Sequence, residues 1–162
     1  MKKYAIRKGH GENLTEHLLH HRGHTTKAQQ ERFLKPDYEK DQHDSALLKD
    51  IDIAVERILK AIKSDEKIII YSDYDTDGIP GGVLLHDFFK KIGFVNFRNY
   101  IPHRHDEGFG LHKEAIKEFA KEKVDLIITI DCGIADVESV KTANKLKIDV
   151  IIALLAKDVY LT

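Results

Sequence analysis

The chain has 162 residues, of which 42% are hydrophobic and 33% are charged, and its formal net charge is −1. That length is enough for one domain with a hydrophobic core, and the composition is that of an ordinary globular protein. The near-zero charge excludes a global basic field, so contact with nucleic acid would require a local patch.

Neither a disulfide framework nor a membrane span is expected. The single cysteine, Cys132, cannot form an internal disulfide and fits a reducing compartment. No apolar run reaches the roughly 18 residues that span a membrane. The basic residues at the start are not followed by the apolar segment of a secretory signal. We therefore expect a cytoplasmic protein without membrane contact.

Residues 1–44 form a polar lead-in that is rich in histidine. Residues 13–21 predict a short helix, and Thr25 or Thr26 is placed to cap a second helix that ends before Pro36. The histidines match no structural zinc pattern and have no cysteine among them, so we interpret them as solvated surface residues. They are His10, His17, His20, His21, His24 and His43.

The rest of the chain, residues 45–162, has the pattern of an α/β domain. Apolar residues recur at spacings of three and four between Ala46 and Ile62, which predicts an amphipathic helix with one buried face. Apolar strands then alternate with helices, which predicts a parallel sheet with helices on both faces. The strands are expected at 67–73, 94–101, 124–130 and 149–155, and the helices at 80–92, 113–123 and 137–147.

The most informative motif follows the first of these strands. Residues 73–78 read Asp-Tyr-Asp-Thr-Asp-Gly, which places three carboxylates at alternate positions. Such carboxylates repel one another unless a cation lies among them, and hard divalent ions prefer oxygen ligands. Asp131 follows the third strand, at the same edge of a parallel sheet. The sequence therefore predicts a shared metal site formed by Asp73, Asp75, Asp77 and Asp131.

Three other interpretations of the acidic motif are weaker. An EF-hand calcium loop requires a glutamate at its twelfth position, which here is Leu84, and it follows a helix rather than a strand. Asp73 or Asp77 could cap the next helix, but three aspartates with a fourth across the sheet exceed what capping needs. A dinucleotide site lacks its Gly-x-Gly-x-x-Gly motif, and the acidic loop would repel pyrophosphate.

A second candidate element is the loop at residues 100–111, after the second strand. Arg104 has the planar guanidinium that binds phosphate or carboxylate with two hydrogen bonds. His103 and His105 are candidate metal ligands or phosphate contacts, although loop histidines are often simply solvated. This loop is expected at the same edge of the sheet as the acidic motif.

Together these segments resemble the RecJ-like single-stranded-DNA exonucleases of the DHH phosphoesterase superfamily. Residues 72–78 match the first motif of that family, residues 100–111 its loop after the second strand, and residues 129–134 its second acidic motif. The lead-in is also similar, at residues 18–23, 33–36 and 43–50.

The resemblance implies a DHH-type, Rossmann-like domain in a nuclease that degrades single-stranded DNA from the 5′ end. It also implies a role in DNA repair and recombination and two Mn²⁺ or Mg²⁺ ions. Single-stranded DNA is the expected partner, and the sequence leaves open a further partner such as a single-strand-binding protein. The family's metal ligands correspond to Asp75, Asp77 and Asp131, with Asp73 as an ancillary carboxylate.

The resemblance ends near Ile152. The Asp-His-His expected after the fourth strand is not found, and no histidine follows His112. The family's further aspartate and second domain are also missing. We therefore expect a truncated, frameshifted or split reading frame, with genuine divergence as the weaker alternative. In either case we expect an incomplete metal site and little or no nuclease activity in this chain alone.

Two alternative functions are weaker. The first is a DHH phosphodiesterase for oligonucleotides or cyclic dinucleotides, which the RecJ-like lead-in disfavours. The second is a non-catalytic scaffold of replication or repair. The retained aspartates disfavour it, because without a metal they would repel one another.

Overall fold

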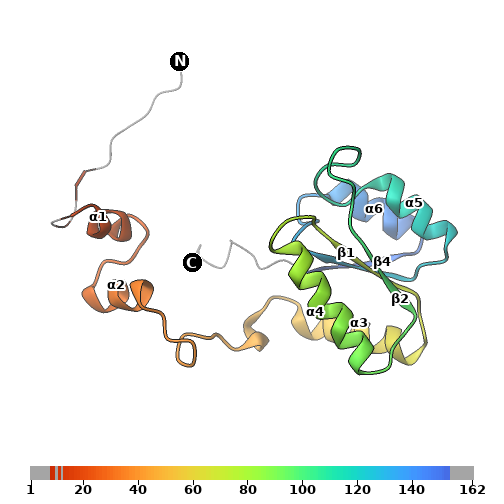
Figure 1. The fold of residues 1–162 in the computed structure, drawn as a ribbon, viewed down its shortest axis with the longest axis horizontal. Coiled ribbons are helices and arrows are strands. Elements are labelled where there is room, and N and C mark those ends of the chain that lie inside the picture. Colours follow the sequence, from red (N-terminus) through yellow and green to blue (C-terminus); the bar gives the residue numbers. More distant parts are fainter. Residues whose placement is uncertain (1–7, 10, 12, 154–162) are drawn as a thin grey trace, which may run out of the picture. The chain divides into compact units, whose positions relative to one another are not determined.

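The computed structural model describes residues 8, 9, 11 and 13–153, and the chain divides into two compact units, Met1–Lys49 and Asp50–Thr162. The first unit contains two short helices, α1 (Leu14–His20) and α2 (Lys27–Leu34), as predicted (Figure 1). Thr26 caps α2 in a reciprocal capping box with Gln29, which satisfies backbone donors at the start of that helix.

The start of the helix predicted over 46–62 was predicted wrongly. Ser45–Leu47 forms only a 3-10 turn, η1, and the helix proper, α3, spans Ile51–Lys63. Between them Leu48 is extended, with ψ 132°, and Asp50 is left-handed, with φ 58°. These two conformations interrupt the helical hydrogen bonds, and neither can be inferred from the spacing of apolar residues.

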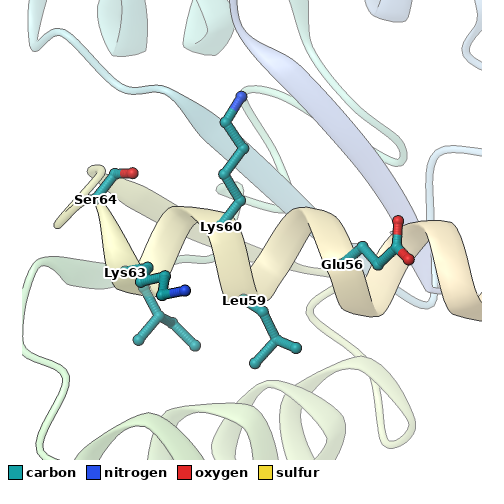
Figure 2. A pocket seen from close by; sticks show the side chains of 6 residues that line it. Glu56, Leu59, Lys60, Lys63 and Ser64 are labelled. Atoms are coloured by element: carbon teal, nitrogen blue, oxygen red, sulfur yellow. The ribbon is translucent and has the colours of Figure 1, made fainter.

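The buried face of α3 is also narrower than predicted. Ala61 is fully buried, whereas Val55 and Leu59 are 46% and 59% exposed. Beside Leu59 the surface has a depression of about 560 Å³ (Figure 2). Its lining contains none of the predicted site residues and consists of Glu56, Leu59, Lys60, Ile62, Lys63 and Ser64.

The second unit is built on a four-stranded parallel sheet, as predicted. Its strands are β1 (Ile68–Ser72), β2 (Phe97–Tyr100), β3 (Leu126–Ile130) and β4 (Asp149–Ala153). Their order in the sheet is β2-β1-β3-β4, and every neighbouring pair is parallel. The two central strands are β1 and β3, and the residues of β1 are all buried.

The first three strands are shorter than predicted. The largest difference is at β2, where Phe94 packs into the core from the preceding turn and Val95 is 74% exposed, so that the extended segment begins later. The last two residues predicted for the fourth strand, 154 and 155, lie outside the described residues.

Helices cover both faces of this sheet (Figure 1). They are α4 (Gly78–Lys91), α5 (Lys113–Lys121) and α6 (Val137–Lys145), in addition to α3. The predicted helix at 80–92 therefore begins two residues earlier, and Pro80 occupies its first turn, where its missing N–H costs no hydrogen bond. Among the described residues, no helix has the length and apolarity needed to cross a membrane.

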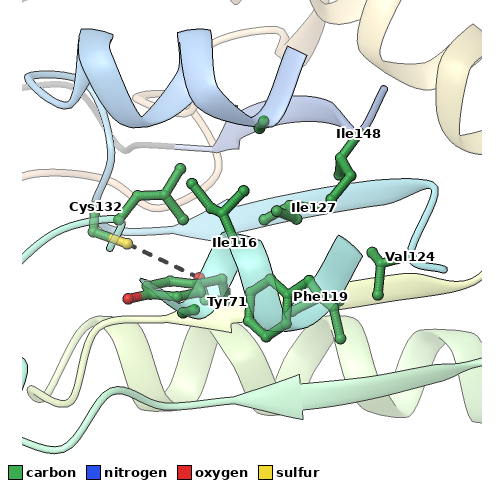
Figure 3. Packing of buried hydrophobic residues seen from close by; sticks show 11 residues of the cluster. Tyr71, Ile116, Phe119, Val124, Ile127, Cys132 and Ile148 are labelled. Atoms are coloured by element: carbon green, nitrogen blue, oxygen red, sulfur yellow. Dashed lines mark hydrogen bonds between the residues drawn. The ribbon is translucent and has the colours of Figure 1, made fainter. Parts of the chain in front are cut away.

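Each face of the sheet has its own hydrophobic cluster. On one face, Ala61 of α3 and Phe89 of α4 pack against Ile68 and Ile70 of β1. On the other face, residues of α5 and α6 pack against Tyr71 and other strand residues (Figure 3). Alternate residues of β1 thus point to opposite clusters, which is why this strand is apolar throughout.

Ion pairs join elements at the amino ends of the strands. Arg57 of α3 donates to Glu66, before β1, at 2.7 Å and to Asp149, at the start of β4, at 2.6 Å. The side chain of Arg57 is 18% exposed, so these charges are partly shielded from water. A second group consists of Glu122, Lys67 and Arg98, with N···O distances of 3.2 and 2.7 Å.

Candidate metal centre

The carboxyl ends of β1 and β3 are neighbours at the point where the strand order changes direction. Their register pairs Ser72 with Ile130, so Asp73 and Asp131 are the next residues on the two chains. The chain leaves β1 toward α4 on one face and leaves β3 toward α6 on the other (Figure 1). Ligands of open parallel sheets bind at such a switch point, outside the carboxyl ends of the strands.

Backbone hydrogen bonds hold both aspartates at this edge. The N–H of Asp73 donates to the carbonyl of Ile130, and the N–H of Asp131 donates to the carbonyl of Ala153, each at 3.1 Å. Asp131 has a left-handed backbone with φ 57°, which ends β3 abruptly. The predicted pairing of Asp131 with the acidic motif across the sheet is therefore present in the backbone.

Glycines let the start of α4 lie directly on these strand ends. A Cβ on Gly78 would overlap the backbone carbonyl of Asp73, and one on Gly81 would lie 2.6 Å from Cγ2 of Ile130. Side chains at these positions would push the helix away from the sheet. The glycines thus keep the acidic motif in a tight turn between β1 and α4.

Asp75 is oriented by its own loop. Its Oδ1 accepts hydrogen bonds from the N–H groups of Asp77 and Gly78, both at 3.0 Å. These backbone donors, with a smaller contribution from the charge of Arg104, hold the pKa of the Asp75 carboxyl below its ordinary value of 3.8. Asp77 itself precedes α4 and makes no side-chain cap bond. The helix-capping contact therefore comes from Asp75, rather than from Asp73 or Asp77.

The other carboxylates make the edge electrostatically negative. Asp73 is 8% exposed, and its Oδ1 accepts the N–H of Tyr74 at 2.7 Å. Burial, together with the charges of Asp73, Asp136 and Asp131, raises the pKa of the Cys132 thiol to about 12. The carboxylates are thus close enough to oppose another negative charge, and a cation would be favoured at the same place.

The aspartates share this edge without forming a ready set of ligands. Within residues 8, 9, 11 and 13–153, no three His, Cys, Asp or Glu side chains are grouped so that they could hold a metal ion together. Asp73, Asp75, Asp77 and Asp131 are thus brought to one edge by the backbone, but no three of their carboxylates are placed together as ligands of one ion.

The loop between β2 and α5 reaches the acidic motif, as the sequence predicts. The guanidinium of Arg104 lies 4.7 Å from the ring centroid of Tyr74, the residue between Asp73 and Asp75. The ring of Phe109, from the same loop, lies 5.1 Å from that of Tyr74. Arg104 is therefore brought to the strand ends of β1.

The two histidines of this loop are arranged differently. The Nδ1 of His103 lies 2.7 Å from the carboxylate of Asp106, and its ring centroid lies 5.8 Å from that of His105. Both histidines therefore lie on the exposed turn around Arg104. The structure pairs His103 with Asp106, and His105 lies beside His103 on the same turn.

Two carboxylates that sequence reasoning missed hold this loop in place. Asp136 accepts the N–H of Leu111 at 2.7 Å. Glu107 accepts the Tyr100 hydroxyl at 2.6 Å and the N–H of His103 at 2.7 Å. The position of Asp136 directly before a predicted helix was a signal, but it indicates a helix cap rather than a bond to a distant loop.

Comparisons with known proteins identify the family of the chain. Residues 67–153 match the model of the DHH family, N-terminal domain. The single-stranded-DNA-specific exonuclease RecJ of Bacillus subtilis (strain 168) is 40% identical over 140 residues, which are 86% of this chain and 17% of that protein. RecJ of Thermus thermophilus is 34% identical over 89 residues, which are 55% of this chain and 13% of that protein.

The fold is also similar to a solved structure. A crystal structure of RecJ from Thermus thermophilus in complex with Mn²⁺ superposes with a TM-score of 0.58 at 24% identity, covering 83% of this chain and 17% of that one. The chain thus spans less than a fifth of the relatives and of the structure described here. Because the family model matches residues 67–153, more than half of the 162 residues, the chain belongs to the DHH family, and it is similar to part of the RecJ exonucleases.

Proposed function

We propose that the chain is the N-terminal, metal-binding part of a RecJ-like exonuclease that hydrolyses single-stranded DNA from the 5′ end in repair and recombination. The observation that supports this most is the position of the acidic motif and Asp131 at adjacent strand ends, where the strand order changes direction. The similarity to RecJ exonucleases supports the substrate class.

The donors at this edge fit Mn²⁺ or Mg²⁺. All are carboxylates, which hard divalent ions prefer, and the charges of Asp73 and Asp131 add to burial in raising the pKa of the Cys132 thiol. Asp75, Asp77 and Asp131 would hold the metal, with Asp73 as an ancillary ligand. When bound, two such ions supply an activated water and stabilise the leaving oxygen of a phosphodiester.

The protein's own residues have distinct tasks in this proposal. The backbone N–H groups at the start of α4 orient Asp75, which leaves its second oxygen to face a ligand. Arg104 binds a phosphate of the strand with its guanidinium, and His103 and His105 add donors at the same turn. These groups hold the strand against the edge of the sheet, where the reacting phosphate must lie.

We further propose that this chain by itself has little or no nuclease activity. As they lie in the described residues, the carboxylates are not grouped into a metal site, so a bound ion would have to draw their side chains together, and the sequence has no histidine after His112. Degradation of 5′-labelled single-stranded DNA with Mn²⁺ tests this point. Turnover near that of a full-length relative, abolished by Asp75→Asn, would contradict it.

Metal binding tests the main proposal. Asp75→Asn keeps an oxygen for the N–H groups of Asp77 and Gly78 but removes the charge. Its affinity for Mn²⁺, measured by calorimetry, should fall roughly tenfold or more, because even residues behind a metal ligand contribute roughly 10–100-fold. Asp65→Asn, at the opposite edge of the sheet, is the matched control and should bind like the unmodified chain. If Mn²⁺ does not bind, or binds equally well to Asp75→Asn, a non-catalytic scaffold would be favoured instead.

A further inference from the structure

An exposed aromatic ring lies beside the acidic motif. Phe109 is 73% exposed, in a loop whose other side chains are largely polar. Its ring is tilted by 40° against that of Tyr74 at a centroid distance of 5.1 Å. Arg104 lies 4.7 Å from the same Tyr74 ring. The three side chains therefore form one cluster, the aromatic platform, which combines two rings with a guanidinium.

The platform is held in place from both sides of Phe109. After it, the carbonyl of Gly110 accepts the hydroxyl of Tyr71 at 2.9 Å, and Asp136 accepts the next backbone N–H, that of Leu111. Before it, Glu107 is bonded to Tyr100 at 2.6 Å. The loop is thus braced to β1, β2 and the start of α6, and the ring needs little reorganisation to accept a ligand.

The position of the platform restricts what it can bind. Tyr74 lies between Asp73 and Asp75 in the chain, so a ligand on the platform also lies beside the proposed metal edge. The two rings of the platform, at a loop whose other side chains are largely polar, offer too little apolar surface for a stable protein interface. A nucleobase is the matching ligand, because every base has a flat face and its attached phosphate can reach Arg104.

We propose that Phe109, supported by Tyr74, stacks on a nucleobase of single-stranded nucleic acid while Arg104 binds a phosphate of the same strand. This inference rests on the proposed function and adds a base contact to it. Bases in a duplex are already stacked on one another, so the platform selects unpaired strands. The contact is independent of base identity, because stacking does not read the hydrogen-bonding edges of a base.

Comparing a normal strand with an abasic strand tests the stacking. A 5′-phosphorylated oligothymidylate and an abasic strand of equal length have the same phosphates but differ in their bases. In the presence of Mn²⁺, fluorescence anisotropy should show tighter binding of the normal strand by on the order of tenfold. Phe109→Ala should abolish that preference, whereas Arg104→Ala should weaken the binding of both strands.

Two further variants exclude a general effect of surface substitution. Val95→Ala removes a side chain of similar exposure, 74%, at the amino edge of the sheet, and should leave both affinities unchanged. Phe109→Trp keeps a stacking ring and introduces the only tryptophan, since the chain has none. Its fluorescence should be quenched by the normal strand and not by the abasic one.

The outcomes separate this inference from the proposed function. Equal binding of the two strands, or an unchanged preference in Phe109→Ala, would overturn the stacking site. If Mn²⁺ binding still depends on Asp75 in that case, the proposed function stands. Failure to bind either strand would overturn the stacking site as well, and loss of Asp75-dependent Mn²⁺ binding would remove the proposed function.

Discussion

The carboxylate of Glu107 shows how one side chain stabilises the candidate site without belonging to it. It accepts hydrogen bonds from the Tyr100 hydroxyl and from the N–H of His103. Burial alone would raise the pKa of Glu107, but these two donors outweigh it and hold the pKa below its ordinary value of 4.5. Burial, with the nearby Glu107 carboxylate, raises the pKa of Tyr100 to about 12. The pair is thus ionised carboxylate and neutral phenol at neutral pH.

This pKa shift predicts a pH-dependent stability. A carboxyl group whose pKa is lowered by folding stabilises the protein above its ordinary pKa, and the effect is lost as the pH falls through the folded value. Glu107→Gln should therefore reduce the free energy of unfolding by roughly 1 kcal/mol at neutral pH. Glutamine has an NH₂ group in place of one carboxylate oxygen, so one of the two donors, the Tyr100 hydroxyl or the His103 N–H, would lose its acceptor. The difference should disappear as the pH is lowered below 4.5.

Urea denaturation at several pH values measures this difference. Glu114→Gln is the matched control, because that side chain is 82% exposed and lies in the first turn of α5. It should leave the free energy of unfolding nearly unchanged at each pH. A Glu107→Gln effect of equal size at neutral and acidic pH would show that the hydrogen-bonded charge is not its cause.

At the scale of elements, helix α4 depends on the glycines of its first turn. Gly78 lies against the backbone of Asp73, whereas Gly81 lies against a methyl group of Ile130. The backbone of Asp73 follows β1 directly and is held by its hydrogen bond to Ile130, whereas a side chain can change its rotamer. The two glycines therefore differ in what their substitution would cost.

Gly78→Ala should destabilise the second unit by roughly 1–3 kcal/mol, the usual cost of overpacking. Gly81→Ala should cost less, because a shift of Ile130 relieves its contact and alanine gains about 1 kcal/mol of helix propensity. Thermal or urea unfolding of the two variants compares them directly. Equal destabilisation would indicate that the helix, rather than the contacted strand, determines the cost.

The helices and strands could be predicted from the sequence where the spacing of apolar residues or a capping residue determines them. The alternation of apolar strands with helices predicts the sheet, and Thr26 predicts the start of α2. The start of α3 was mispredicted because Asp50 adopts a left-handed backbone inside an otherwise helical pattern. The bond from Asp136 to Leu111 joins residues 25 positions apart, and no local pattern encodes such a contact.

The candidate site shows the same division. The positions of Asp73 and Asp131 at one edge follow from the parallel arrangement of strands that the sequence predicts. The orientation of Asp75 depends on two backbone N–H groups of its turn, and the contact of Arg104 with Tyr74 depends on the path of a long loop. The orientation of each carboxylate is therefore a property of the loops, whereas the edge at which it lies is a property of the sheet.

At the scale of the molecule, the first unit ends in a segment with little regular structure, which leads into the second unit. Between the end of α2 and the start of α3, the only helical element is the three-residue turn η1. The segment between α2 and α3 has exposed lysines that lie outside any helix: Lys35, Lys40 and Lys49.

Limited trypsin digestion should therefore cleave first in this connection and leave a resistant fragment that begins near Asp50. Lysines within helices, such as Lys60 and Lys117, should be cleaved later, because proteases require locally unfolded backbone. Mass spectrometry of the first fragments identifies the sites. Early cleavage inside the sheet unit would show that residues 50–153 do not form an independent unit under these conditions.

The parallel sheet also separates two kinds of residue that an engineer would want to change independently. The amino ends of the strands bear the ion pairs of Arg57 and Glu122, and the carboxyl ends bear the aspartates, Arg104 and Phe109. Since the lengths of the strands keep these groups apart, substitutions at the amino ends can tune melting temperature while ligand affinity stays constant. Thermal stability and ligand affinity could thus be optimised in two separate libraries of variants, one for each end of the strands.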